Sequence, residues 1–313
     1  MFSFFIWIII WDTIPLVNLN AQSTLSQYSG AHYIGKNYVT TLDTAKLCII
    51  YSLNYMSDSL KPQQIFKDRK VLLIGEQLNH FYSYYEWLAD SAMTADFDKN
   101  KSSGDPKFPA GVRREGGQIY TYPAIKERTV IESITNLSTY RYKETVEKLQ
   151  WILSTDTCTI LSYPCLKATT NFRGRDWIVW FTMEVPVNAG PWKLCGLPGL
   201  IMKASDSRGH YVFECMGIEQ LTTKKERIII RNANYIDCKR LEYVKAQKRF
   251  YESYVNTLLE MGITVVIMDN NGKELETLST PNTKYEEQGA YWMKSVNIAD
   301  QNRKIPYNPI ELE

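Results

Sequence analysis

The stretch Asn188-Ala-Gly-Pro-Trp-Lys-Leu-Cys-Gly-Leu-Pro-Gly-Leu-Ile-Met202 lies between two apolar segments and determines how the chain turns from one to the other. It contains three glycines, two prolines and a tryptophan. Pro191 and Pro198 fix φ, whereas Gly196 and Gly199 permit unusual backbone angles or a close approach of another backbone segment. We therefore expect a rigid turn that is essential for the structure.

The segments on both sides of this turn have the alternation that is typical of β-strands. In residues 176–187, Trp177, Val179 and Phe181 fall on one side of the pleat, and a mixed set of residues falls on the other. Such a pattern predicts a strand that covers a core with one face. Residues 200–205 and 211–216 are expected to pair across a turn at 206–209.

The rest of the chain is also read mainly as strands, with one clear helix. The helix is predicted over 237–261, with Asp237 as its N-cap and Gly262 after its last turn. Residues 79–90 are expected to begin as a strand and end as a short helix, and 96–117 to be a loop. Further strands are expected at 47–55, 70–75, 118–123, 127–134, 138–149, 151–161, 163–170, 226–231 and 264–268.

The N-terminal segment predicts export. Phe2–Ile10 is a nine-residue apolar run, and the following residues are typical of a signal peptide that ends near residue 22. The run has no Lys or Arg before it, which leaves open a misassigned start codon. A spanning helix needs ~20 apolar residues, so the protein is not expected to be integral to a membrane. We expect a signal peptide over 1–22, a single β domain over 23–276 and an extended tail over 277–313.

Composition and motifs exclude several classes of protein. The net charge of +2, without a dense run of Lys and Arg, argues against a nucleic-acid-binding protein. Nucleotide-binding glycine loops, nucleophile elbows and metalloprotease motifs are absent from the sequence, so no catalytic residue and no cofactor are predicted. The three histidines are scattered, no Cys-x-x-Cys occurs, and no metal site is expected.

Three side chains near the 176–187 segment are candidates for binding. Arg173 and Arg175 flank Gly174 in a predicted turn and could grip an anion, although the turn could equally pair its charges with its neighbours. Trp180 could line a groove for a sugar or a peptide. Each of these is a hypothesis about ligand contact rather than about catalysis.

The six cysteines permit disulfide bonds in an exported chain. Only Cys158 and Cys165 have a local argument for pairing, because a tight hairpin at Leu161-Ser-Tyr-Pro164 would set them opposite each other. The alternative is that the cysteines are buried free thiols.

The hexapeptide Gly196-Leu197-Pro198-Gly199-Leu200-Ile201 resembles the signature of the GLPGLI family of secreted proteins from Bacteroidetes-type bacteria. The resemblance extends over 151–220, including Gly190-Pro191-Trp192-Lys193, and to the closing Tyr307-Asn-Pro-Ile-Glu-Leu-Glu313. A glycine is common in the family where Ser162 stands. The resemblance implies a mainly β (α+β) fold, a curved antiparallel sheet, bowl-like or half-barrel, with a helix nearby. It implies location in the periplasm or at the outer membrane, and association with a TonB-dependent outer-membrane receptor.

These observations leave three hypotheses for function. The first is a non-enzymatic binding or accessory protein whose sheet holds a peptide, a lipid or an outer-membrane partner. The second is a hydrolase that acts on peptide or glycan, which requires a histidine or two carboxylates to converge in a cleft. The third is a structural component of the envelope with a large apolar patch.

Overall fold

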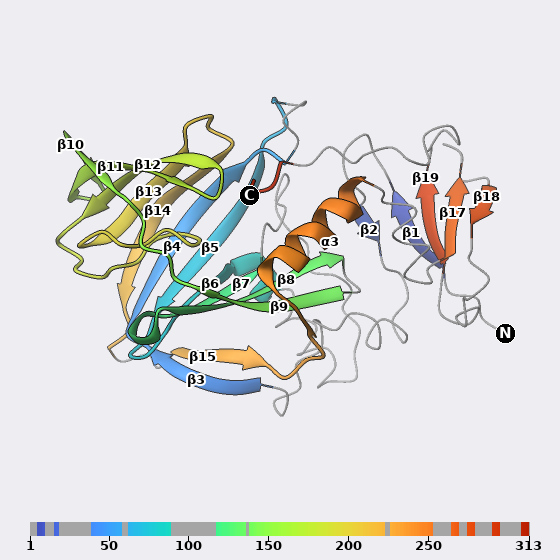
Figure 1. Ribbon diagram of the computed structural model, residues 1–313, viewed down its shortest axis with the longest axis horizontal. Helices are drawn as coiled ribbons and strands as arrows, with labels where there is room; N and C mark the ends of the chain where they lie inside the picture. The colour runs from blue at the N-terminus through green and yellow to red at the C-terminus, as the bar shows by residue number, and fades with distance from the viewer. Residues whose placement is uncertain are drawn as a thin grey trace. The chain divides into compact units, whose positions relative to one another are not determined.

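The computed structural model forms two compact units (Figure 1). One consists of Met1–Gly30 and Leu241–Pro306, and the other of Ala31–Arg240 and Tyr307–Glu313. The structure describes residues 5–9, 16–18, 39–57, 62–88, 117–135, 138–222, 226–252, 264–268, 274–278, 290–294 and 308–312.

The second unit is built on a twelve-stranded sheet. Its strands follow the order β10 (Ile152–Ile160), β11 (Tyr163–Phe172), β12 (Arg175–Thr182), β13 (Leu200–Asp206), β14 (Tyr211–Gln220), β4 (Leu47–Tyr55), β5 (Phe66–Ile74), β6 (Asn79–Ser83), β7 (Gln118–Tyr122), β8 (Glu127–Thr135), β9 (Ser138–Thr145) and β16 (Ile236–Asp237). Neighbouring strands are antiparallel, except that β16 runs parallel to β9. Since β10 and β16 are the two edges, the sheet is open, and the predicted mainly-β curved sheet is confirmed.

Alternation along the strands places the core on the face that the sequence predicts. Trp177, Val179 and Phe181 of β12 are buried, whereas Ile178 and Trp180 between them are half-buried. The core on this face is rich in large aromatic side chains, which bury more apolar surface per residue than aliphatic ones. Its largest fully buried aromatic members are Tyr51, Tyr55, Trp177, Phe181, Tyr211 and Phe213.

A second layer covers part of the sheet. The strands β3 (Val39–Ala45) and β15 (Glu226–Arg231) form a separate antiparallel pair. Ala45 and Ile228 of this pair belong to one buried apolar cluster with residues of β5, β7 and β8, namely Val71, Leu73, Tyr120 and Ile131. The pair therefore packs over the middle of the large sheet.

The first unit contains a five-stranded sheet in the order β18 (Glu274–Leu278), β17 (Thr264–Met268), β19 (Ala290–Lys294), β1 (Phe5–Ile9) and β2 (Leu16–Asn18). Two of these strands lie within the predicted signal peptide and one within the predicted tail. The single domain expected over 23–276 differs from this division, because β17 pairs with β18 and β19 and not with the large sheet. Cleavage of a leader remains a prediction.

The predicted helix starts later than expected. It is α3 (Arg240–Glu252), and residues 253–261 of the prediction lie outside the described residues. Asp237 does not cap it, because the Asp237 carboxylate accepts two hydrogen bonds from Arg141 at 2.6 and 2.8 Å. The strand-to-helix change predicted at 79–90 is confirmed as β6 followed by a helical turn at 84–88, and the predicted loop at 96–117 lies almost wholly outside the described residues.

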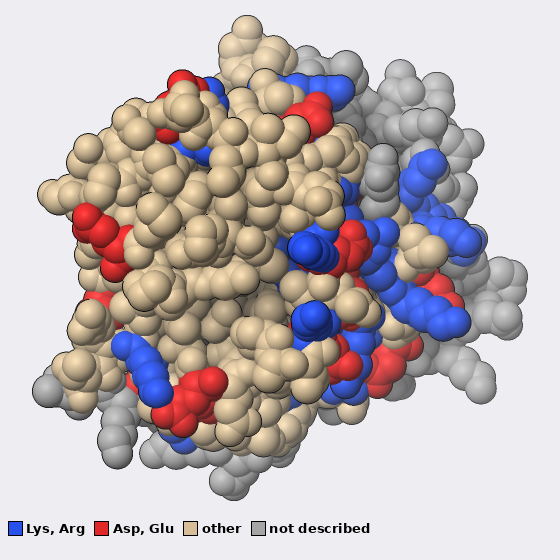
Figure 2. Space-filling model, turned by 60° about the vertical axis from the view of Figure 1, so that its left-hand side comes forward, with Lys and Arg blue, Asp and Glu red and all other residues tan. Residues whose placement is uncertain are grey.

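Charges on the surface around β10–β14 are mixed in sign. Figure 2 brings this side of the molecule forward, and uncharged residues cover a large part of it. Lys and Arg lie in small groups with Asp and Glu, as in the pairs Lys167–Asp156 and Lys203–Glu214. None of the described helices is long and apolar enough to cross a membrane.

Candidate functional site

Residues 188–202, which connect β12 to β13 and contain the family-like hexapeptide, are called the signature turn. This turn is held by hydrogen bonds to its backbone. Arg128 of β8 donates to the Lys193 carbonyl at 3.0 Å, and the Trp151 indole donates to the Cys195 carbonyl at 3.0 Å. Tyr51 of β4 donates to the Ile201 carbonyl at 2.8 Å. Three separate parts of the chain thus fix the turn.

The glycines of the turn have the two roles that the sequence predicts. Gly196 has a φ of 104°, a region that side chains rarely adopt. At Gly199 a Cβ atom would lie 2.0 Å from the Thr182 carbonyl oxygen, so only glycine allows this approach. Trp192 has a φ of 55° and is buried against Phe172 and Trp177, with ring centroids 5.4 and 5.6 Å away. Aromatic packing of this kind offsets the cost of its backbone conformation.

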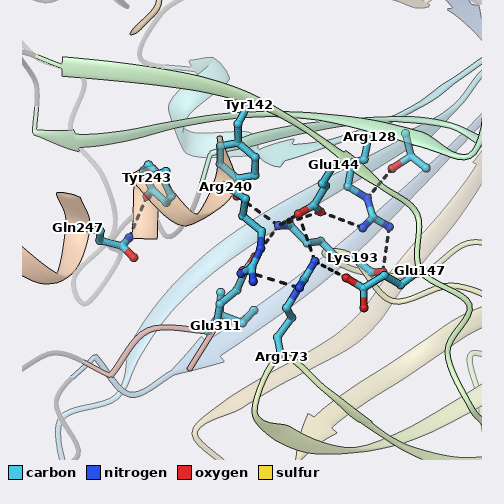
Figure 3. A network of polar contacts seen from close by, with 12 residues as sticks. Arg128, Tyr142, Glu144, Glu147, Arg173, Lys193, Arg240, Tyr243, Gln247 and Glu311 are labelled. Carbon is cyan, nitrogen blue, oxygen red and sulfur yellow. Dashed lines mark hydrogen bonds and ion pairs between the residues drawn. The ribbon is translucent and has the colours of Figure 1, made fainter. Parts of the chain in front are cut away.

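The next residue of the turn, Lys193, directs its ammonium group into a buried ionic cluster (Figure 3). The Lys193 side chain is fully buried, and its Nζ lies 3.0 and 3.1 Å from the two carboxylate oxygens of Glu144 on β9. The same Nζ donates to Tyr142 at 3.3 Å and to the carboxylate of Glu311 near the C-terminus. We call the group formed by Arg128, Glu144, Arg173, Lys193, Arg240 and Glu311 the ionic cluster.

Arg128 joins this cluster to the large sheet. Its Nη1 lies 3.2 Å from Glu144, directly opposite on β9, and its Nε donates to Thr121 of β7 at 3.2 Å. With the bond to the Lys193 carbonyl, one guanidinium group connects two strands and the signature turn. Arginine suits this task because its fork of donors can hold several acceptors at once.

Arg173 enters the cluster from the hairpin turn between β11 and β12. Arg173 and Gly174 have φ values of 53° and 73°, which is the geometry of a two-residue type I′ turn. The Arg173 guanidinium lies 3.4 Å from Glu144, 2.7 Å from Glu147 and 3.8 Å from Glu311. The anion-gripping role proposed for this arginine is therefore filled by carboxylates of the chain itself.

Arg175, on the other side of the same turn, holds the C-terminal segment 308–312. Its Nη1 lies 2.7 Å from Asp206 of β13, and its Nη2 donates to the Asn308 side-chain oxygen at 2.8 Å. Its Nε donates to the Ile310 carbonyl at 2.9 Å, and a further bond reaches the Pro309 carbonyl. The side chains of Arg175 and Asp206 are each only 2% exposed, so the bonds form in a setting of low dielectric.

Asn308 is bonded at every polar group that it presents. Its backbone N–H donates to the Ser57 carbonyl at 2.8 Å, and its side-chain amide donates to the Met56 carbonyl at 2.7 Å. Its own carbonyl accepts from Tyr211 at 2.8 Å. Together with the bond from Arg175, these bonds satisfy the backbone and the side chain of Asn308.

The surrounding cations favour the charged form of Glu144. Burial would raise the pKa of Glu144, but the charges of Lys193, Arg128 and Arg173 outweigh it and hold that pKa below its ordinary value. Both carboxylates that meet at Lys193 are held by cations, so the site is suited to recognition by charge. A group that gives and takes a proton at neutral pH needs a pKa near 7.

The other candidates from the sequence lie apart from the cluster. Trp180 faces the side of β12 opposite to Arg175, within 5.9 Å of Lys167. Cys158 and Cys165 are direct cross-strand partners in the β10–β11 hairpin, as predicted, and both are free thiols whose pKa is raised by burial. Their disulfide remains a prediction.

The two described histidines, His80 and His210, lie in different parts of the fold. His80 is buried between the rings of Tyr82 and Tyr120, with centroids 4.6 and 4.2 Å away, and burial lowers its pKa to about 3. His210 lies in the turn before β14, and His32 falls outside the described part of the chain. Within that part, no group of three or more His, Cys, Asp or Glu residues could hold a metal ion.

Sequence reasoning missed most of the cluster. Arg128 and Glu144 stand in ordinary strand patterns, and nothing in those patterns indicates a buried charge. The one available signal was the resemblance itself, because the signature turn and the C-terminal segment that carry it meet at Lys193 and Glu311.

Comparisons with known proteins give a partial match. A family model described as "N-glycanase peptide, N-terminal domain" matches residues 92–244. Two solved structures resemble the chain, "Structure of PNGF-II in P21 space group" and "Structure of PNGF-II in C2 space group", with 17% and 16% sequence identity and a TM-score of 0.42 for each. They match 65% of this chain, which spans 33% and 32% of theirs. No curated protein matches the chain.

Proposed function

We propose that this chain is a non-enzymatic binding domain that recognises peptides or glycopeptides in the cell envelope. The observation that carries the proposal is the segment 308–312, which the ionic cluster holds by charge and which Arg175 and Tyr211 hold by hydrogen bonds. Cations, carbonyls and hydroxyls that already hold one peptide segment are suited to bind another peptide of similar chemistry.

The titration behaviour of the described residues supports binding over catalysis. The carboxylates with a shifted pKa, Asp43, Glu144, Asp156 and Asp237, all have it lowered. The cysteines with a shifted pKa all have it raised, to about 11 at Cys165 and Cys215. These shifts move each group away from the neutral range in which general acids and bases work.

The family-model match supports the ligand class. Its description names the N-terminal domain of an N-glycanase, and the matched residues 92–244 include the signature turn, both turn arginines and Glu144. A domain of this kind in a glycan-processing protein makes glycopeptides reasonable ligands. The same match favours a second candidate function, a hydrolase acting on peptide or glycan, whose reacting groups would have to come from residues outside the ionic cluster.

The location and partner belong to the same proposal. The resemblance to the GLPGLI family and the apolar N-terminal run support export to the periplasm or the outer membrane. A TonB-dependent receptor is then the proposed partner, with a peptide as the preferred ligand and a lipid as the alternative.

One experiment separates binding from hydrolysis. The full chain is incubated with an N-glycosylated peptide and with its unglycosylated form, and both are followed by affinity measurement and by mass spectrometry. We expect saturable binding and unchanged masses. Cleavage that increases in proportion to protein concentration would contradict the proposal and favour the hydrolase, and absence of binding to both peptides would also contradict it.

A further inference from the structure

The C-terminal segment 308–312 is attached to the second unit as a bound peptide would be. It has no regular secondary structure, and the apolar side chain of Leu312 is 44% exposed while those of Pro309 and Ile310 are half-buried. Its contacts are instead polar, made by Arg175, Tyr211, Arg173 and Lys193. Attachment by charge and hydrogen bonds, with little apolar burial, is characteristic of a recognised ligand rather than of a core element.

The second unit recognises two side chains of the segment, Asn308 and Glu311, at a fixed spacing. The asparagine amide of Asn308 is bonded by Arg175 and by the Met56 carbonyl. Three residues later, the Glu311 carboxylate meets Lys193, Arg240 at 2.7 Å and Arg173 at 3.8 Å. The backbone between them is held at the Pro309 and Ile310 carbonyls, so the register of the two side chains is fixed.

The cationic end of this site leaves one buried donor without a hydrogen bond. Three cations of the ionic cluster, Arg173, Lys193 and Arg240, meet the Glu311 carboxylate. The Arg173 Nε atom is buried and has no hydrogen-bond partner, because the Glu311 oxygen lies 3.8 Å away. A buried donor without an acceptor is costly, and an acid that sits slightly deeper would satisfy it.

We infer that the site formed by Met56, Ser57, Arg173, Arg175, Lys193 and Tyr211 binds a peptide with an asparagine followed three residues later by an acidic side chain. The chain's own segment 308–312 occupies this site and competes with such a peptide in trans. The inference rests on the proposed binding function and names its ligand class.

The test uses a fluorescent peptide with the sequence of residues 307–313 and the full chain. The wild-type protein is compared with the variant Glu311→Gln, whose own segment has lost its charge, by fluorescence anisotropy at low ionic strength. A tethered competitor acts at an effective concentration in the millimolar range. We therefore expect the peptide to bind the variant at least about tenfold more tightly than the wild type.

Control peptides and a control variant make the result specific. A peptide with Gln in place of the Glu311 equivalent, or Ala in place of the Asn308 equivalent, should bind the Glu311→Gln protein about tenfold more weakly, since each loses charge-assisted hydrogen bonds. The protein variant Glu127→Gln removes a carboxylate of the exposed Lys143–Glu127 pair, which lies outside the ionic cluster, and it should bind the peptide as the wild type does.

Equal binding of all peptides to the folded variant would overturn the inference. So would the absence of saturable binding to the wild type, to Glu311→Gln and to the milder Glu311→Asp. If Glu311→Gln does not fold, Glu311→Asp and the wild type still decide between specific and unspecific binding. A protein that binds glycopeptides elsewhere but not this peptide would keep the proposed function and lose only this site.

Discussion

Two ion pairs on strands β8 and β9 are neighbours in the sequence but differ in burial and in the number of their partners. Arg128 of β8 and Glu144 of β9 lie directly opposite each other, with side chains 3% and 6% exposed. One residue away on each strand, Glu127 and Lys143 form a pair on the other face, with side chains 34% and 68% exposed. The exposed pair is the closer one, at 2.8 Å against 3.2 Å.

From this comparison we expect burial and the number of partners, rather than the separation of the charges, to determine how much an ion pair contributes to stability. Water and salt screen the exposed pair, which costs side-chain entropy to hold. The buried pair has lost its water, and it is compensated only because Lys193, Thr121 and a backbone carbonyl complete its bonding. The stability of the protein should therefore be sensitive to the loss of any residue that bonds to the buried Arg128–Glu144 pair.

Removal of Arg128 is expected to give the largest effect. The substitution Arg128→Met keeps an unbranched apolar side chain but removes one of the three cations that hold the buried Glu144, together with the Arg128 donor to the Lys193 carbonyl. We expect the free energy of unfolding to fall by about 3–5 kcal/mol, measured by urea denaturation. The matched control Lys143→Met should change it by less than about 1 kcal/mol. Similar losses for the two variants would show that burial is not the deciding factor.

The substitution Glu311→Gln tests an outer member of the cluster. Lys193 keeps both oxygens of Glu144 when Glu311 is neutralised, and the Glu311 side chain is 11% exposed, against 3% for Arg128. We expect the free energy of unfolding to fall by about 1–3 kcal/mol, the usual cost of losing charged hydrogen bonds. A loss as large as that of Arg128→Met would mean that the segment 308–312 is part of the core rather than a bound peptide.

Acid should reduce the contribution of the buried Glu144 to the free energy of unfolding. The pKa of Glu144 in the folded protein lies below its ordinary value of 4.5, so its contribution to stability is complete above that pH. The contribution is lost as the pH falls through the lowered pKa, because the unfolded state then binds the proton more readily. Urea denaturation between pH 7 and pH 3 should show a steeper decline for the wild type than for Glu144→Gln. Parallel curves would contradict the assignment.

Salt should produce the smallest change in the free energy of unfolding, and it should act only on the exposed Lys143–Glu127 pair. Raising the salt concentration to 1 M shortens the screening length to about 3 Å, which removes the small contribution of the Lys143–Glu127 pair. The difference in unfolding free energy between wild type and Lys143→Met should shrink by a few tenths of a kcal/mol. The difference between wild type and Arg128→Met should stay unchanged, and equal shrinkage would break the comparison.

The sequence predicted the parts of the fold that depend on local patterns. Alternation in 176–187 identified the buried face of β12, and the Pro-Gly composition of the signature turn identified positions that demand glycine, as Gly196 and Gly199 show. The cross-strand position of Cys158 and Cys165 followed from the hairpin turn between them. These features depend on a few consecutive residues, which is why they can be read from the chain.

The parts that depend on distant contacts could not be predicted. Lys193 is followed 118 positions later by Glu311, and no local pattern joins them. Asp237 has the sequence context of a helix cap, but Arg141 takes its carboxylate from a strand 96 positions earlier. The sequence indicated that the turn with Arg173 and Arg175 could hold an anion. It did not indicate that the anions are carboxylates of the same chain, such as Glu311.

The measurement that tests the central claim most directly is a double-mutant cycle between Lys193 and Glu311. Unfolding free energies of the wild type, Lys193→Met, Glu311→Gln and the double variant are determined by urea denaturation. If the signature turn and the C-terminal segment meet in one ionic cluster, the coupling energy should be about 1–3 kcal/mol, as for residues in a shared network. Additivity within about 0.3 kcal/mol, the behaviour of independent sites, would contradict the account.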